Sequence, residues 1–238
     1  MSGLLVLAGV LGACEASIGP VPDPGIVVQV ILLGGQPTQF AWVEQAASPD
    51  SQVNSVMRPI DANALVLALL GDSGQAVLFA PTVNPAQFSV QRQVDGPSTY
   101  QIVGGYMGTP IHAKCLVPAP LRIQPEGSVH VASGDSVVIH WNAAAGASVY
   151  ALSSHSFPSA APSLTYAVFT SDTSYVLRGL PAGVSLTEVL YVMAIDSVSA
   201  AFFAAASSPA GRVRGNIEGA LGACGGATVD SVLVVDGP

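Results

Sequence analysis

The sequence predicts an all-β protein made of two antiparallel β-sandwich domains with at most one short helix. Short runs rich in aliphatic and aromatic residues recur about every 8–12 residues, separated by Gly, Pro, Asp and Ser. No heptad repeat and no long stretch of helical periodicity interrupts this pattern. The chain has 238 residues, half of them hydrophobic, which suffices for one large or two ordinary β-domains with a buried core.

The first group of runs predicts about seven strands. A continuous apolar run at 26–33 ends at the Gly34-Gly35 turn, and the run at 39–45 alternates apolar and polar residues as a half-buried strand does. The next two runs flank the sequence Gly-Asp-Ser-Gly at 71–74, which favours a hairpin. The expected strands are 26–33, 39–45, 65–70, 75–79, 87–91, 99–103 and 111–117.

A second group of runs begins after Val-Pro-Ala-Pro at 117–120. This sequence is a natural domain boundary, because each proline fixes φ and removes a donor from a strand ladder. The Ala-rich segment 200–206 is the one expected helix, since alanine is the best helix former. A Gly-rich stretch at 215–226 leads into a last strand at 228–235. The other expected strands are 136–141, 148–152, 164–169, 174–177 and 188–195.

The charge content excludes two classes of protein. Charged residues make up only 9% of the chain, whereas an intrinsically disordered chain combines high charge with low hydrophobicity. Seven Lys and Arg against fifteen Asp and Glu give a net charge of −8. Binding to a nucleic-acid backbone requires a basic face, so we expect no nucleic-acid partner.

The N-terminus predicts the compartment. Residues 4–13 form an apolar run of ten, too short for a membrane-spanning helix and typical of a secretory signal peptide. The run ends in Leu-Gly-Ala-Cys at 11–14, which resembles the lipobox of bacterial lipoproteins. The resemblance implies cleavage after Ala13 and a membrane anchor of fatty acyl chains, such as palmitate, on Cys14. Because Glu15 is not the aspartate associated with inner-membrane retention, it implies the outer membrane or cell surface.

One feature opposes the signal-peptide interpretation. No Lys or Arg precedes the apolar run, although signal peptides normally begin with a positive region. The alternative is a buried N-terminal strand or helix that contains Cys14. The expected organisation is a signal peptide at 1–13, a Pro-rich tether at 14–25, sandwich domains at 26–118 and 119–214, and a Gly-rich segment with the final strand at 215–238.

Two further cysteines raise the question of a disulfide. If Cys14 carries lipid, Cys115 and Cys224 remain, 109 residues apart, and an exported chain can oxidise them. A bridge would tie the C-terminal segment to the first domain. The alternative is two separate buried thiols that pack as small hydrophobic residues. The sequence leaves both alternatives open.

The second domain resembles a fibronectin type III domain. Residues 137–142, with Trp141, resemble strand B, and 146–150 resemble the start of strand C. Residues 180–183 and 191–194 resemble the corner and strand F. The resemblance implies a sandwich with Trp141 in its core. The Ala-rich segment 200–206 departs from this pattern, because a regular last strand is expected there.

The whole chain resembles a group of uncharacterised outer-membrane lipoproteins of Gram-negative bacteria. They carry a transthyretin-like or immunoglobulin-like domain that is joined to, or interrupted by, a fibronectin-like one. This resemblance implies an immunoglobulin/transthyretin-like fold for 26–118. The resemblance to this group implies a cellular location and a fold, but it says little about a mechanism. The segments that carry the resemblance are 26–46, 58–64, 65–79, 99–118 and 215–219.

Two serine motifs are similar to nucleophile motifs of hydrolases. Ser73 lies in Gly-Asp-Ser-Gly at 71–74 and Ser136 in Gly-Asp-Ser at 134–136, and both motifs stand where tight turns are expected. We interpret them as turns and expect no enzyme activity. No Cys or carboxylate stands at a ligand spacing beside the histidines, so we also expect no metal and no cofactor. The histidines are His112, His130, His140 and His155.

Phe202 and Phe203 are the candidate partner surface. Packing in the core explains them adequately, whereas an exposed pair would mark an interaction site. The sequence thus predicts a lipid-anchored envelope protein that acts as a non-catalytic binding or scaffolding module. Its expected partners are the membrane, through Cys14, and an envelope protein such as an outer-membrane transporter, or a glycan. The alternatives are a structural subunit of a surface layer or filament, and a secreted hydrolase.

Overall fold

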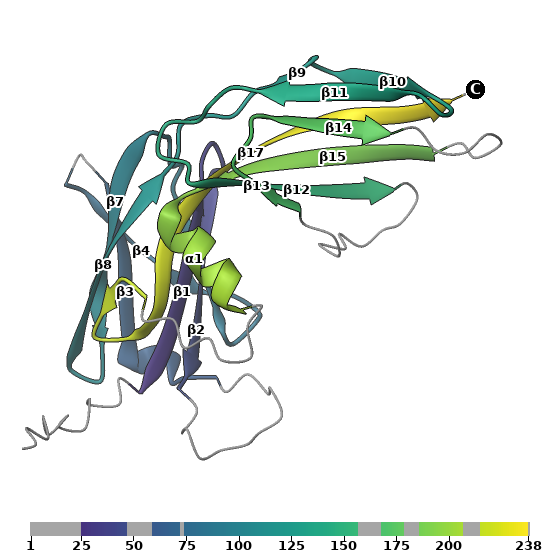
Figure 1. The fold of residues 1–238 in the computed structure, drawn as a ribbon. Helices are drawn as coiled ribbons and strands as arrows, with labels where there is room; N and C mark the ends of the chain where they lie inside the picture. The colour runs from purple at the N-terminus through teal and green to yellow at the C-terminus, as the bar shows by residue number, and fades with distance from the viewer. Residues whose placement is uncertain are drawn as a thin grey trace, which may run out of the picture.

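The computed structural model describes residues 25–46, 59–71, 74–156, 168–178, 186–206 and 215–237, and within these it is mostly β-structure with one α-helix. The predicted all-β class is therefore confirmed (Figure 1). The elements, in chain order, are β1 (Ile26–Leu33), β2 (Thr38–Gln45), a 3₁₀ turn (Ala62–Ala64), β3 (Leu65–Leu70), β4 (Ala76–Leu78), β5 (Ala80–Pro81), β6 (Gln87–Gln91), β7 (Ser98–Tyr106), β8 (Thr109–Val117), β9 (Ile123–Gln124), β10 (Ser128–Ala132), β11 (Ser136–Trp141), β12 (Val149–Ser156), β13 (Val168–Thr170), β14 (Ser174–Arg178), β15 (Leu186–Ile195), α1 (Ser197–Ala206), β16 (Ile217–Glu218) and β17 (Leu221–Gly237).

The first sandwich forms because its strands alternate between a core face and an outer face. In β1, Ile26, Val28, Val30 and Leu32 are fully buried, while the residues between them are half-buried. One layer contains β17, β1, β2, β6 and β5 in that order, and the other contains β16, β8, β7, β3 and β4. One cluster of buried hydrophobic residues lies between the two layers.

The second sandwich has the fibronectin type III-like arrangement expected from its sequence. A sheet of β14, β11 and β9 faces β13, β12, β15 and β17, and β10 pairs with β17. Trp141, at the end of β11, is 5% exposed and makes an edge contact with Tyr150, with ring centroids 5.6 Å apart. A second buried cluster forms around this pair.

The last strand belongs to both sandwiches. Residues 221–227 of β17 pair in parallel with β1, and residues 227–236 pair antiparallel with β15 (Figure 1). The expected strand at 228–235 therefore begins seven residues earlier, at Leu221. The β10–β17 pairing is also parallel, so the sandwiches are not purely antiparallel as expected. A single strand continues one hydrogen-bonded sheet from the first core into the second.

A disulfide joins Cys115 and Cys224, which settles the question that the sequence left open. Their Cα atoms are 5.1 Å apart, and both residues are fully buried in the first core. The bond connects β8 in one layer with β17 in the other, because the register of β17 against β1 directs Cys224 inward. The start of β17 is thereby fixed within the first sandwich.

Candidate functional site

The candidate site is a groove beside α1. The side chain of a buried aspartate, Asp196, caps the N-terminus of that helix. The side chain of Asp196 accepts hydrogen bonds from the backbone N–H of Ser199 at 3.0 Å and of Val198 at 3.3 Å. The same carboxylate accepts from the N–H of Gly226 on β17 at 3.1 Å. Asp196 is 1% exposed, so these bonds form away from water. The predicted helix is confirmed and begins at Ser197, three residues before the Ala-rich segment, because this cap starts it.

A glycine lets α1 lie directly on β17. A Cβ atom at Gly225 would collide with Ser199 Oγ and Asp196 Oδ1. Any larger residue would therefore push the helix away from the strand. The Gly-rich stretch that was expected only to lead into the last strand therefore allows this close approach. Figure 1 shows α1 crossing β17 beside β1.

The strands next to α1 carry an apolar outer face. Ile31 of β1 lies opposite Phe40 of β2, and Gln29 lies opposite Trp42. The Phe40 and Trp42 rings are 6.2 Å apart, centroid to centroid, at an angle of 41°. These side chains point away from the first core, because the buried residues of β1 and β2 are the alternate ones. The outer face of β1 and β2 is therefore more apolar than the usual solvent-facing side of a strand.

The groove consists of two adjoining cavities that share Ile31, Trp42 and Phe203. The larger cavity, of about 270 Å³, also reaches Glu44 and Phe202 and is called the acidic lobe here. The smaller cavity, of about 170 Å³, is called the apolar lobe. The acidic lobe is lined by Gln29, Val30, Ile31, Trp42, Glu44, Ser199, Phe202, Phe203 and Ala223. The apolar lobe is lined by Ile31, Leu33, Thr38, Gln39, Phe40, Trp42, Met193 and Phe203.

Two of the polar residues that line the acidic lobe are Ser199 and Glu44. Ser199 is 2% exposed, and its Oγ has no hydrogen-bond partner. Buried hydroxyl groups are normally paired, so this one is an exception in the packing of α1 on β17. The carboxylate of Glu44 is half-exposed, and no ion pair to it occurs among the described residues. Neither residue stands out in the sequence, because only the fold brings them together.

The structure locates only part of the predicted site. Phe202 and Phe203 are half-buried on α1, with ring centroids 6.2 Å apart, and both line the groove. Whether this surface binds a partner stays a prediction. Cys14 lies outside the described residues. Sequence reasoning missed Trp42 and Phe40, although their spacing of two residues on a predicted strand placed them on one face.

Backbone hydrogen bonds typical of turns occur at both serine motifs. The N–H of Gly74 bonds to the carbonyl of Gly71 at 2.9 Å, and Ser73 itself lies outside the described residues. The N–H of Asp135 bonds to the carbonyl of Ala132 at 3.0 Å, immediately before Ser136.

The three histidines whose side chains the structure describes do not converge on a metal site. His112 Nε2 lies 3.1 Å from Gln101 Oε1, and His130 and His140 lie in different sheets. The side chain of His155 is outside the described set. Within the described ranges, no three His, Cys, Asp or Glu side chains are grouped so that they could hold a metal ion. Among the same residues, α1 is too short to cross a membrane, and no other helix there is long and apolar enough.

Comparisons with known proteins find only distant structural likeness. No protein-family model matches the chain, and no curated protein matches it. The chicken CNTN1 FN1–FN3 domains align with a TM-score of 0.28 and 12% identity, over 74% of this chain and 63% of theirs. The fibronectin(III)-like modules of Clostridium thermocellum CbhA align with a TM-score of 0.26 and 11% identity, over 88% of this chain and 93% of theirs. The fold assignment therefore depends on the strand pairing of this chain, and the lipoprotein resemblance stays a prediction.

Proposed function

We propose that this protein is a non-catalytic binding module of the cell envelope, anchored by lipid on Cys14, and that the groove beside α1 is its binding surface. The observation that carries the proposal is the placement of aromatic side chains outside both cores. Trp42 and Phe203 line a groove of two cavities together with an unpaired buried hydroxyl. Concave, mostly apolar surfaces with a few polar groups are the usual form of binding sites.

The sequence supports the anchoring half of the proposal. The apolar run at 4–13 and the Leu-Gly-Ala-Cys sequence that ends in Cys14 resemble a lipoprotein signal. The described part of the chain begins at Gly25, after the Pro-rich tether. A lipid on Cys14 would hold the groove near the membrane, where a transporter or a glycan is within reach. The partner classes remain those inferred from the sequence.

Membrane fractionation tests the anchor. Cys14→Ser should move the protein from the membrane fraction to the soluble fraction, because the acyl chains supply the membrane affinity. Mass spectrometry of the wild-type protein should find an acylated N-terminal Cys14. An unmodified N-terminus at Met1 in a cytosolic protein would overturn the anchor and the location.

Crosslinking in intact cells tests the binding surface. A photoreactive residue at Phe203, on α1, should capture a defined envelope component. The matched control is the same residue at Val138, which is 44% exposed on the second sandwich, away from the groove. Equal capture patterns at the two positions would refute the groove as the binding surface while leaving the anchor unaffected.

A further inference from the structure

The groove has the shape of a site for an extended chain. It follows β2 from Glu44 in the acidic lobe to Thr38 in the apolar lobe. The six steps from residue 38 to residue 44 of a strand span about 20 Å. Each lobe is smaller than the roughly 300 Å³ of a typical drug-sized site, so each fits one or two side chains. Two small lobes in line along a strand match side chains that an extended polypeptide directs to one face.

The acidic lobe has the chemistry of a site for a positively charged side chain. Its rings come from Trp42, Phe202 and Phe203, and its carboxylate comes from Glu44. A Lys or Arg side chain among aromatic rings gains cation–π attraction, and a carboxylate that has no ion pair among the described residues adds direct charge attraction. The net charge of −8 adds a long-range attraction for a basic partner.

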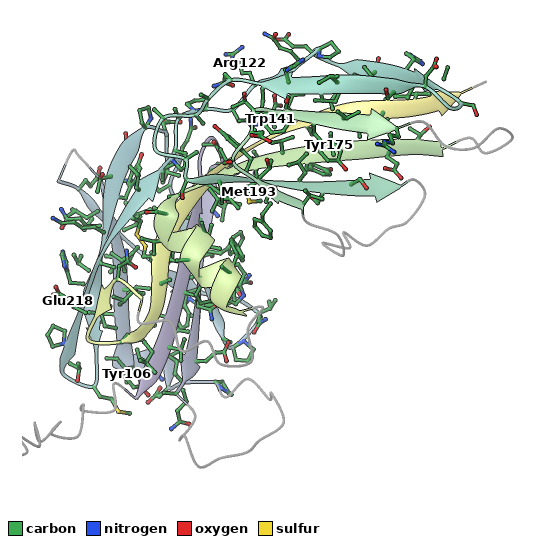
Figure 2. The ribbon with its side chains drawn as sticks, in the orientation of Figure 1. Tyr106, Arg122, Trp141, Tyr175, Met193 and Glu218 are labelled. Carbon is green, nitrogen blue, oxygen red and sulfur yellow. A yellow bond between two sulfur atoms is a disulfide. The ribbon has the colours of Figure 1, made fainter. Side chains whose placement is uncertain are left out.

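The apolar lobe has the chemistry of a site for an aliphatic side chain. Leu33, Phe40 and Met193 line it, and it contains no charged residue. Met193 comes from β15 of the second sandwich and is labelled beside α1 in Figure 2. A flexible thioether adapts to side chains of different shapes, which suits a peptide site.

We propose that the groove binds an extended segment of another polypeptide, with a Lys or Arg side chain in the acidic lobe and an aliphatic side chain in the apolar lobe. This inference rests on the proposed function and names the partner class of the same groove. Gln29 and Leu33, which line different lobes, are four residues apart on β1, or about 13 Å. The basic and aliphatic residues of the ligand are therefore four apart, an even spacing that directs both to one face of an extended chain.

A set of blocked peptides tests the inference. The full chain with Cys14→Ser is used, so that no acyl chain competes for the groove. The probes are acetylated and amidated peptides of sequence Ser-Lys-Ala-Thr-Ala-Leu-Ser, and versions with Gln or Glu in place of Lys. The fluorescence of Trp42 reports binding, because the only other tryptophan, Trp141, is buried in the second core. The Lys peptide should bind about five times more tightly than the Gln peptide, and the Glu peptide more weakly still.

Changing the charge of Glu44 distinguishes a role in recognising the peptide from a purely structural role. Glu44→Gln should remove the preference for Lys over Gln, and Glu44→Lys should reverse it in favour of the Glu peptide. The matched control is Glu218→Gln, an exposed carboxylate on β16 in the other layer of the first sandwich (Figure 2), which should leave all affinities unchanged. A merely structural Glu44 would weaken every peptide equally, which would contradict the inference.

Three other results would overturn it. The first is equal affinity of wild-type protein for the Lys, Gln and Glu peptides. The second is binding of a soluble oligosaccharide, but of no peptide, in the groove. The third is peptide binding only after Arg212→Ser and Arg214→Ser, which would assign the groove to the chain's own segment 207–214. A persistent envelope crosslink at Phe203 in any of these cases would leave the proposed function standing.

Discussion

Replacing Asp196 by alanine tests how α1 is held. The change removes three hydrogen-bond acceptor contacts from one buried carboxylate. Loss of an N-cap lowers stability by about 1 kcal/mol. The N–H of Gly226 would also be left buried and unpaired, which lowers stability by about 1–3 kcal/mol. The expected decrease in the free energy of unfolding is therefore about 2–4 kcal/mol.

Urea unfolding followed by circular dichroism measures this decrease. With a slope of about 2–3 kcal/mol per molar urea, the midpoint should fall by about 1 M. Asp135→Ala is the control, because Asp135 is an exposed turn residue and its loss should change stability by less than about 0.5 kcal/mol. Asp196→Asn keeps a side-chain acceptor and should lie between wild type and Asp196→Ala. Equal midpoints for Asp196→Ala and Asp135→Ala would refute the proposed attachment of the helix.

Three further predictions concern the surroundings of the groove. Replacing Cys115 and Cys224 together by alanine should lower the free energy of unfolding by about 2–5 kcal/mol, since the bond closes a loop of 109 residues, and calorimetry with and without reductant measures it. Gly225→Ala should destabilise the protein and weaken the binding of the Lys peptide, because its Cβ displaces α1; unchanged peptide affinity would refute the close approach. Ser199→Ala should raise the free energy of unfolding by about 1 kcal/mol, since it removes an unpaired buried hydroxyl, and thermal unfolding measures it; a lower unfolding temperature would show that the hydroxyl is paired in the free protein.

The strands that sequence reasoning predicted well are those with a strong local signal. The predicted bounds of β1, β3, β6 and β11 equal the observed ones, because continuous or alternating apolar runs determine where such strands begin and end. The short strands β5, β9, β10 and β16 were missed. Each has five residues or fewer and depends on its partner strand for its conformation.

The course of β17 could not be predicted, because its Gly-rich half has no strand-like composition. Residues 221–227 form a strand since glycine and alanine fit between β1, β8 and the overlying helix. A Cβ atom at Gly226 would meet the backbone of β8. The pattern that is typical of a flexible linker therefore marks close packing here, and only tertiary contacts distinguish the two.

The candidate site was predicted only in part for a similar reason. Phe202 and Phe203 drew attention because they interrupt an Ala-rich segment, but their partners are remote in the chain. Trp42 lies 160 residues before Phe202, and Glu44 carries no motif. Sequence periodicity shows which side of a strand a residue occupies, but it does not show which helix covers that side.

Because of the path of the chain, residues of both sandwiches line the groove. β15 belongs to the second sandwich, and the chain passes from its end directly through Asp196 into α1, which lies on the part of β17 that pairs with β1. One wall of the groove therefore comes from the crossover helix, the floor and far wall come from the first sandwich, and Met193 comes from the second. Because Asp196 and Gly225 fix that crossover at the junction, neither sandwich alone contains the complete groove. A binding function assigned to the groove consequently requires the whole chain from β1 to β17.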